Sequence, residues 1–367
     1  HNDTEILMHN ISKSINELSK EKNNSPDPVS VFGELHEQLD GAYNIGMINA
    51  EGKVMAVRDP LGFRPMCYGM TDEKVLFASE SVALQLCDVN SIRPLRPGEI
   101  LINENSETRV ERFAKSPRKA HCMFEWVYFA NVGSVLDEKS VYLARTNLGK
   151  AMARLEPLKP DKDFVVVPVP DSSRPFADAY AYELGLPVRE GLVRNRCVGR
   201  TFIEGNDRAN KIRYKFTVLK EILKDKKVLV VDDSIVRGTT CKKLVEFIRD
   251  KGHAKEVHLR ISCPPILAPC FYGIDMSTIR ELIAPQHFSE MGEDISDEAC
   301  ARIADEVGAD SLVYQKLENI PKAIGIPKCD LCMACLTGEY PTEWGCRLYE
   351  KAKENHKNGV QARTHEC

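Results

Sequence analysis

Val228-Leu229-Val230-Val231-Asp232-Asp233-Ser234-Ile235-Val236-Arg237-Gly238-Thr239-Thr240 is the stretch that decides the fold of this chain. Its four leading aliphatic residues predict a buried parallel strand. Two carboxylates follow at the carboxyl end of that strand, where open α/β sheets bind their ligands. The loop after them offers hydroxyls and backbone N–H groups to a phosphate, and Thr239-Thr240 are expected to cap a helix that starts near Cys241. The stretch therefore predicts a pocket for a phosphorylated sugar, whose hydroxyls or accompanying Mg²⁺ the acidic pair would bind.

The same stretch resembles the motif with which type I phosphoribosyltransferases bind 5-phosphoribosyl-1-diphosphate (PRPP). With Pro264-Pro265 and residues 269–275 downstream, it is similar to one family in particular, the glutamine PRPP amidotransferases of purine synthesis, and the similarity covers nearly the whole chain. The resemblance implies that PRPP and ammonia from glutamine are converted to 5-phosphoribosylamine and diphosphate. Two alternatives are a salvage phosphoribosyltransferase and a PRPP-binding regulatory protein. Salvage enzymes lack a glutaminase-like front and a cysteine-bearing tail, and no helix-turn-helix or basic patch of a DNA-binding regulator is evident.

Composition agrees with a globular enzyme of two domains. The chain has 367 residues, of which 43% are hydrophobic and 28% charged. The net charge of −4 gives no reason to expect a nucleic-acid partner. No apolar run is long enough to cross a membrane, and no signal peptide opens the chain. Thirteen cysteines without a secretory signal indicate a reducing compartment, so we expect a cytoplasmic protein whose thiols are free or bind metal.

Residues 1–115 have the pattern of helices and antiparallel strands. Helices are expected from Asp3 and over 31–39, a hairpin over 42–58, and further strands over 75–80 and 99–102. Arg58 and Arg64 flank a turn with Asp59-Pro60 and are compatible with plain surface charges. The resemblance implies that this segment is the C-terminal portion of an N-terminal-nucleophile (Ntn) glutaminase domain of the α+β type, a class II glutamine amidotransferase.

Residues 116–315 alternate between apolar strands and helices, which predicts a doubly wound parallel α/β sheet. The expected strands cover 164–169, 188–193, 228–231, 256–261 and 311–314, and the expected helices 141–155, 176–184, 241–251 and 297–307. By resemblance this is the type I phosphoribosyltransferase domain. Residues 316–367 form a cysteine-bearing C-terminal tail that we expect to wrap over the sheet domain.

A second polar loop follows the strand at 164–169. It contains Asp171, Ser172 and Ser173, and without the resemblance it would be a plain capped turn. The resemblance makes it the pyrophosphate loop and implies that Ser172, with Asp232 and Asp233, binds Mg²⁺. It also implies which residues contact PRPP; these are Asp171, Ser172, Ser173, Asp232, Asp233, Ser234, Arg237, Gly238, Thr239 and Thr240.

A basic stretch runs from Arg194 through Arg208 and Lys211 to Lys215. As a charge run alone it would be a solvated face. The resemblance implies a flexible lid over PRPP that excludes water and neutralises the leaving diphosphate. Arg200 and Arg213 are the expected catalytic diphosphate contacts.

Cys329-x-x-Cys332-x-x-Cys335 has the spacing of a thiolate metal site, and more distant cysteines must complete it. The resemblance implies a structural [4Fe–4S] cluster bound by Cys122, Cys270, Cys332 and Cys335. Cys329 is a competing ligand, and Zn²⁺ is the alternative metal because four thiolates also suit it. The remaining cysteines are expected to be small buried hydrophobes; examples are Cys67, Cys87, Cys197 and Cys241.

By the family pattern, this sequence contains only part of the residues that bind and hydrolyse glutamine. Family members use an N-terminal cysteine as nucleophile, whereas this sequence starts at His1 and has no cysteine before Cys67. Asp3 matches a glutamine-binding residue and is equally suited to cap a helix. We therefore expect that a preceding segment was lost or cleaved, or that a separate chain supplies it. Residues 131–134 depart from the family's usual Arg-Pro-Asp-Ser continuation. The resemblance further implies a homo-oligomer, expected to be a tetramer, and inhibition by purine nucleotides.

Overall fold

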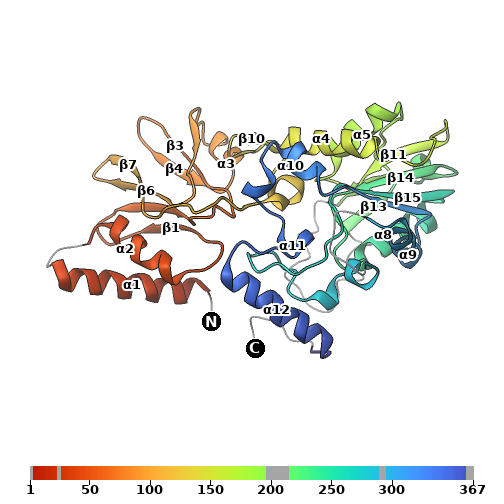
Figure 1. The fold of residues 1–367 in the computed structure, drawn as a ribbon. Helices are drawn as coiled ribbons and strands as arrows, with labels where there is room; N and C mark the ends of the chain where they lie inside the picture. Colours follow the sequence, from red (N-terminus) through yellow and green to blue (C-terminus); the bar gives the residue numbers. More distant parts are fainter. Residues whose placement is uncertain (1–2, 23–25, 196–214, 289–294, 361–367) are drawn as a thin grey trace.

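The computed structural model describes residues 3–22, 26–195, 215–288 and 295–360. Figure 1 shows the N-terminal elements on one side, the parallel sheet on the other, and the C-terminal tail between and beneath them. Among the residues described, no helix is both long and apolar enough to cross a membrane.

The N-terminal part contains two antiparallel sheets. The first has the order β1-β2-β6-β7 and consists of β1 (Asn44–Ile48), β2 (Val54–Arg58), β6 (Glu99–Glu104) and β7 (Glu107–Arg112). The second has the order β4-β3-β5 and consists of β4 (Val75–Ala78), β3 (Cys67–Met70) and β5 (Ile92–Pro94). Helix α3 (Ser81–Gln85) follows β4 along the chain. Helices α1 (Asp3–Lys22) and α2 (Pro28–Leu35) place Ile11, Phe32 and Leu35 in one core with Val57 and Ile100 of the first sheet. The predicted helices and hairpin of this part are confirmed.

The second part is a four-stranded parallel sheet with the order β11-β14-β15-β16. Its strands are β11 (Phe164–Pro168), β14 (Lys227–Asp232), β15 (Glu256–Ile261) and β16 (Ser311–Tyr314). Figure 1 shows α4 (Val141–Ala153) and α5 (Arg174–Leu184) above this sheet and α8 (Thr239–Gly252) and α9 (Asp297–Val307) below it. This doubly wound arrangement is the predicted one, because runs of Val, Leu and Ile suit strands that are buried on both faces.

The strand expected at 188–193 is wrong. Val188 makes only a single bridge to Val166, and the chain then turns at Gly191, whose N–H donates to Arg189 O at 3.0 Å. A Cβ atom at Gly191 would lie 2.6 Å from Leu223 Cδ2, so any other residue in this turn would have to displace the Leu223 side chain. Beyond it, β12 (Leu192–Arg194) pairs antiparallel with β13 (Phe216–Val218), ahead of α7 (Lys220–Leu223).

The linking segment and the tail meet in a small parallel pair of strands. The link contains β8 (His121–Cys122), a π-helix (Glu125–Phe129), β9 (Val135–Leu136) and β10 (Lys139–Ser140). The tail contains α10 (Asn319–Ile324), β17 (Leu331–Cys332), α11 (Ala334–Thr337) and α12 (Glu343–Lys357). Single 3₁₀ turns cover His36–Gln38, Ile279–Glu281, Ala284–Gln286 and Lys328–Asp330. β17 pairs with β8, and α10 lies on α4, where Asn147 Nδ2 donates to Ala323 O at 3.1 Å. The tail thus reaches the sheet domain as expected, and it also contacts the N-terminal part through the Trp344 N–H and Asp40 Oδ2.

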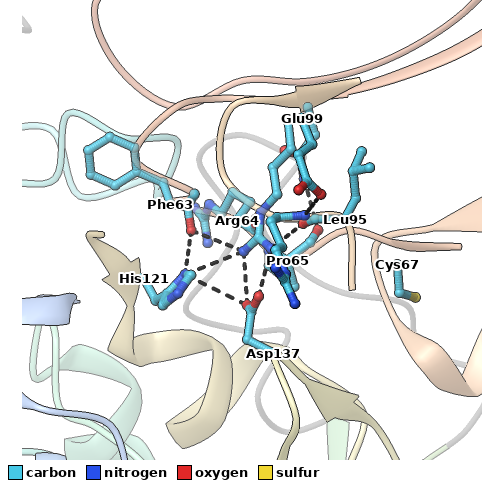
Figure 2. A network of polar contacts seen from close by, with 12 residues as sticks. Phe63, Arg64, Pro65, Cys67, Leu95, Glu99, His121 and Asp137 are labelled. Atoms are coloured by element: carbon cyan, nitrogen blue, oxygen red, sulfur yellow. Dashed lines mark hydrogen bonds and ion pairs between the residues drawn. The ribbon is translucent and has the colours of Figure 1, made fainter. Parts of the chain in front are cut away.

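Arg58 fastens the N-terminal part to the rest of the chain. The sequence-based interpretation of Arg58 as a surface charge is wrong, because its side chain is fully buried. Its two terminal nitrogens donate to Asp137 Oδ1 at 2.7 Å and Asp137 Oδ2 at 2.9 Å, and also to the carbonyls of Leu95 and Gly62. Figure 2 shows Asp137 and His121 on one side of this network, and His121 Nδ1 lies 2.7 Å from Gly62 O. A bidentate, buried ion pair therefore joins β2 to the β9–β10 hairpin.

Arg64 makes a second link in the same region. Its Nη1 donates to Glu125 Oε1 of the π-helix at 2.6 Å, and its Nη2 donates to Tyr272 O at 3.1 Å. The side chain is 21% exposed. Both contacts cross from the N-terminal part into later segments, so Arg64 also lies at a junction rather than on an open surface.

Candidate functional site

The acidic pair lies at the carboxyl end of β14, where the backbone is hydrogen-bonded on both sides. The Val169 N–H donates to Val231 O at 2.8 Å from the β11 side. From the β15 side, the Ser262 N–H donates to Asp232 O at 3.0 Å and the Cys263 N–H to Asp233 O at 2.9 Å. These bonds extend the sheet past its last paired residues and fix both carboxylates in place.

The loop after β11 meets this pair directly. Ser172 Oγ donates to Asp233 Oδ2 at 2.6 Å, and Ser234 Oγ donates to Asp233 Oδ1 at 2.8 Å. The Asp233 N–H donates to Asp232 Oδ1 at 2.9 Å. Ser172, Asp232 and Asp233, which the sequence analysis expects to bind Mg²⁺, are therefore brought together from two strand ends.

Burial sets the electrostatics of the pair. Burial and the neighbouring Asp233 charge raise the pKa of Asp232 well above its usual value. Burial also raises the pKa of Asp233, although the hydroxyls of Ser172 and Ser234 and the charge of Arg145 act in the opposite direction. Two carboxylates of like charge in one buried place favour a bound cation or the hydroxyl donors of a sugar.

The turn between β14 and α8 differs from the expectation in one detail. Thr239 and Thr240 lie inside the first turn of α8, and the N-cap residue is Gly238 with a φ of +73°. The predicted threonine cap is wrong because the chain needs a left-handed residue here, and a Cβ at Gly238 would lie 2.5 Å from Ile283 Cδ1. Since Gly238 has no side chain to cap the helix, the backbone N–H groups of the first turn of α8 receive no side-chain cap from it.

Arg237 does not point its guanidinium freely into this turn. Its Nε donates to Glu281 Oε2 at 2.7 Å, and its Nη2 donates to Asp275 O at 3.2 Å. Glu281 was not foreseen from the sequence, since nothing in a linear pattern pairs it with a residue so far away. The side chain of Arg237 is thus bonded to the segment 275–281 beside the turn.

The other polar residues of the loop after β11 differ in exposure. Asp171 is exposed, and its Oδ2 accepts from Arg194 Nη1 at 3.0 Å. Ser173 is buried, and its hydroxyl lowers the pKa of Asp232 against the effect of burial. The peptide bond between Pro170 and Asp171 is cis.

Several expected contacts cannot be placed. Arg200 and Arg213, with Arg208 and Lys211, lie outside the described residues. Lys215 is described and lies 5.2 Å from the centre of the Phe216 ring. Its charge acts on both carboxylates of the acidic pair. At the other end of the chain, Asp3 is exposed in the first turn of α1.

The four expected cysteine ligands line one largely apolar cavity. Cys122, Cys270, Cys332 and Cys335 share its wall with aromatic rings such as that of Tyr340. Cys122 and Cys332 are register partners in the β8–β17 pair. The carbonyl of Cys335 accepts from the N–H groups of residues 267 and 268, which brings the loop bearing Cys270 to the same place. Cys329 is exposed and does not line the cavity.

Burial dominates the electrostatics of the four thiols that line this cavity. Burial raises the pKa of all four thiols, that of Cys332 to about 12. The Tyr272 N–H donates to Cys270 Sγ at 3.4 Å, and the charge of Arg64 lowers the pKa values of Cys122 and Cys270 against the effect of burial. A buried thiol becomes a thiolate only when a cation or such donors compensate its charge. In the part of the chain that the structure describes, no three His, Cys, Asp or Glu side chains are close enough to hold one metal ion.

The other cysteines follow the expectation in part. Cys67 and Cys241 are buried as predicted, whereas Cys87 is exposed and that prediction is wrong. Cys87 lies two residues past the end of α3, at the surface. Cys197 lies outside the described residues.

Comparisons with known proteins agree with both parts of this architecture. The phosphoribosyl transferase domain family matches residues 142–265, and the glutamine amidotransferase domain family matches residues 1–86. The first range contains both strand ends of the acidic site, and the second contains β1, β2 and the Arg58 junction.

Curated relatives match over nearly the whole chain. An amidophosphoribosyltransferase from Methanothermobacter thermautotrophicus is 40% identical over 93% of this chain and 67% of its own length. An amidophosphoribosyltransferase from Bacillus subtilis is 39% identical over 93% of this chain and 68% of its own length. Among solved structures, the glutamine PRPP amidotransferase from B. subtilis in complex with ADP and GMP is 36% identical, with a TM-score of 0.77, over 93% of this chain and 71% of that one.

Proposed function

This chain belongs to the amidophosphoribosyltransferase family, and from that membership we propose that the acidic pocket at the end of β14 binds PRPP and transfers its ribose 5-phosphate to ammonia. Family members are glycosyltransferases that carry out the first step of purine synthesis. The observation that carries the proposal is the hydrogen bond of 2.6 Å between Ser172 Oγ and Asp233 Oδ2, because it joins the two loops that a sugar diphosphate must span.

The residues of the pocket fit Mg²⁺ and the ribose. Asp232, Asp233 and Ser172 offer the hard oxygen ligands that Mg²⁺ takes, and the pair of buried carboxylates gains from a nearby cation. Mg²⁺ held there supplies positive charge to the diphosphate oxygens. The carboxylates orient the ribose hydroxyls, while Ser234 and the backbone from Arg237 through Gly238 to the first turn of α8 hold the 5-phosphate.

Little covalent chemistry is required of the protein. The ammonia nitrogen forms a bond to the anomeric carbon while the bond from that carbon to the diphosphate oxygen breaks, and the diphosphate leaves with the electron pair. The nitrogen then loses a proton to water. Because charge develops on the leaving diphosphate, position, positive charge and exclusion of water provide the rate enhancement. The basic residues 200 and 213 belong to this proposal as diphosphate contacts.

Release of diphosphate from PRPP with Mg²⁺ and ammonia tests the proposal. We expect turnover by the intact protein and a loss on the order of 100-fold or more in Asp233→Asn, since a ligand of the reacting sugar is altered. Asp250→Asn changes an exposed carboxylate on α8 and serves as the matched control. Wild-type turnover in Asp233→Asn contradicts the assignment of the site. Turnover only with a purine base identifies a salvage enzyme, and PRPP binding without turnover identifies a regulator.

We propose a [4Fe–4S] cluster, rather than Zn²⁺, for the cavity of Cys122, Cys270, Cys332 and Cys335. A single tetrahedral Zn²⁺ draws four sulfurs to within about 2.3 Å of one point. The described thiols line a common cavity without any three close enough to hold one ion, which suits a larger group with one thiolate on each iron. Bound there, the cluster supplies a covalent cross-link between β8, the loop of Cys270 and the tail.

Iron, sulfide and zinc analysis of anaerobically purified protein tests this assignment. We expect iron and sulfide in the wild type, a large loss in Cys335→Ser, and no loss in Cys329→Ser, because only Cys335 lines the cavity. Stoichiometric zinc without iron contradicts the cluster. Iron lost in Cys329→Ser would contradict the ligand set.

Further partners follow from the relatives. The solved B. subtilis protein is described in complex with ADP and GMP, and we propose purine nucleotides as inhibitors of this chain as well. A homo-oligomer, glutamine as the nitrogen source and a glutamine contact at Asp3 belong to the same proposal. Activity with glutamine in place of ammonia, measured with and without a nucleotide, tests these parts.

A further inference from the structure

Arg145 on α4 is a buried cation that the sequence analysis did not single out. Figure 1 shows α4, the helix that contains Arg145, between β10 and α5, and Arg145 itself is only 3% exposed. Among the residues described, none of its hydrogen bonds goes to a carboxylate. An unpaired buried guanidinium is rare because removing its charge from water is costly, so a specific role is expected.

All of its hydrogen bonds go to backbone carbonyls. Its Nε donates to Trp126 O at 2.9 Å, and its Nη2 donates to Tyr128 O at 3.0 Å and to Ala130 O at 2.8 Å. These carbonyls lie in the π-helix and at its end, where no following helical turn supplies N–H donors for them. Arg145 therefore fixes the course of the chain from 126 to 130.

The other terminal nitrogen reaches the candidate catalytic pocket. Arg145 Nη1 donates to Ser172 O at 3.4 Å, and the hydroxyl of the same serine donates to Asp233. One residue thus accepts from Arg145 through its carbonyl and donates to the acidic pair through its side chain. The charge of Asp233 acts in turn on Arg145.

The residues just after the segment held by Arg145 are hydrogen-bonded to the N-terminal part of the molecule. Glu80 Oε2 accepts from the Asn131 N–H at 2.6 Å and from Ser134 Oγ at 2.8 Å. Ser134 is fully buried, and the charge of Glu80 also acts on Arg145. Arg145 hence lies between a carboxylate of the acidic site and a carboxylate of the N-terminal part.

We propose that Arg145 is a positioning residue for phosphoribosyl transfer, which holds the Ser172 loop against Asp233 and joins that loop to the contact between the two parts of the molecule. This inference rests on the proposed function of the Asp232-Asp233 pocket. Lysine retains the charge at this position, but its single nitrogen cannot reach carbonyls on both sides, as the planar guanidinium does.

Steady-state kinetics of Arg145→Lys in the full chain, with PRPP, Mg²⁺ and ammonia, tests the role. We expect the KM for PRPP to rise about tenfold or more, with a smaller change in kcat, because a charge-assisted hydrogen bond to the substrate loop is lost. The rise in unfolding temperature that PRPP and Mg²⁺ produce should shrink as well. A merely structural arginine would lower the unfolding temperature with and without PRPP by the same amount and leave the KM unchanged.

Asn147→Ala is the matched control on the same helix. Asn147 donates only to Ala323 O of α10, so its loss should leave the KM for PRPP unchanged. If Arg145→Lys does not fold, Glu80→Ala tests the same inference through the carboxylate of the N-terminal part. We expect the KM for PRPP to rise severalfold in that variant. An unchanged KM in the variant that folds overturns the inference. Absence of turnover in the wild type overturns the proposed function instead, so the two failures are distinguishable.

Discussion

Asp137→Asn removes one charge from the buried ion pair that joins β2 to the β9–β10 hairpin and keeps the shape of the side chain. Arg58 is fully buried, and Asp137 is 13% exposed at its side chain. After the substitution, the amide oxygen can still accept one hydrogen bond, while the amide NH₂ faces a guanidinium N–H that loses its acceptor. The carbonyls of Leu95, Gly62 and Arg64 remain as partners of a cation without a counter-ion.

The expected loss of stability follows from this geometry. Removing one member of a buried pair destabilises by about 3–5 kcal/mol, because the other charge is left buried and unpaired. One retained hydrogen bond places Asp137→Asn at the lower end, at about 3 kcal/mol. The left-handed backbone of Asp137, with a φ of 45°, is tolerated by asparagine, so the substitution adds no strain of its own.

Urea unfolding followed by the fluorescence of Trp126 measures this loss where it occurs. Trp126 is 1% exposed, and its Nε1 donates to Lys139 O of the same hairpin. The chain has only two tryptophans, and the exposed Trp344 can be replaced by Phe in both proteins. A loss of about 3 kcal/mol corresponds to a midpoint lower by about 1 M urea.

A surface pair provides the control for the charge change itself. Glu318→Gln breaks an exposed pair with Lys322, for which about 0.5 kcal/mol or less is expected. If Asp137→Asn shifts the midpoint no more than Glu318→Gln does, the burial argument is refuted.

The pH dependence of the difference has a defined sign. Burial alone would raise the pKa of Asp137, but the charge and hydrogen bonds of Arg58 bring that pKa below its usual value. The stabilisation is therefore complete above the unfolded-state pKa of about 4 and is lost as the pH falls below it. The gap between wild type and Asp137→Asn should narrow below about pH 4.

Three further substitutions have expected outcomes. Gly238→Ala combines a positive φ with a Cβ only 2.5 Å from a neighbouring side chain. We therefore expect about 1–2 kcal/mol lower stability in thermal unfolding and a higher KM for PRPP. An unchanged KM would show that the turn does not contact the phosphate. Glu156→Gln leaves Arg260, which is fully buried, without its bidentate carboxylate, and calorimetry should show a loss of about 3–5 kcal/mol; a loss below 1 kcal/mol contradicts this. Burial raises the pKa of Asp59 to about 6, so the wild type should lose up to about 3 kcal/mol of stability as the pH rises from 4 to 6. In a series of urea midpoints measured over this pH range, Asp59→Asn should abolish the pH dependence. A pH dependence that persists in the variant argues against this carboxyl as its source.

The parallel sheet was predictable because its information is local. Uninterrupted β-branched and aliphatic runs such as Val228–Val231 favour strands buried on both faces, and acidic residues directly after such a strand lie at the ligand-binding edge of the sheet. The structure confirms β14, β15 and β16 on this basis. The strand expected at 188–193 failed because Gly191 turns the chain where a Cβ would collide with Leu223, a fact of tertiary packing.

The buried arginines were not predictable from their neighbours in sequence. Whether Arg58 is a surface charge or a buried hub depends on Asp137, which is 79 residues away. Arg145 depends on carbonyl groups, which no sequence pattern displays. The four cavity cysteines were found through the resemblance rather than through spacing, since only the Cys332–Cys335 pair has a recognisable local motif.

The pairing of β8 with β17 also has a consequence for the order in which the molecule is completed. A chain is synthesised from its amino end, and its early domains fold while later residues are still being added. Cys122 and the loop of Cys270 precede the tail, so their cavity stays open until Cys332 and Cys335 have been made and β17 has docked. Contacts between residues this distant in sequence also form slowly. The cysteine cavity therefore closes late in synthesis and folding. A closed cavity means that the chain has been translated through residue 335 and has folded.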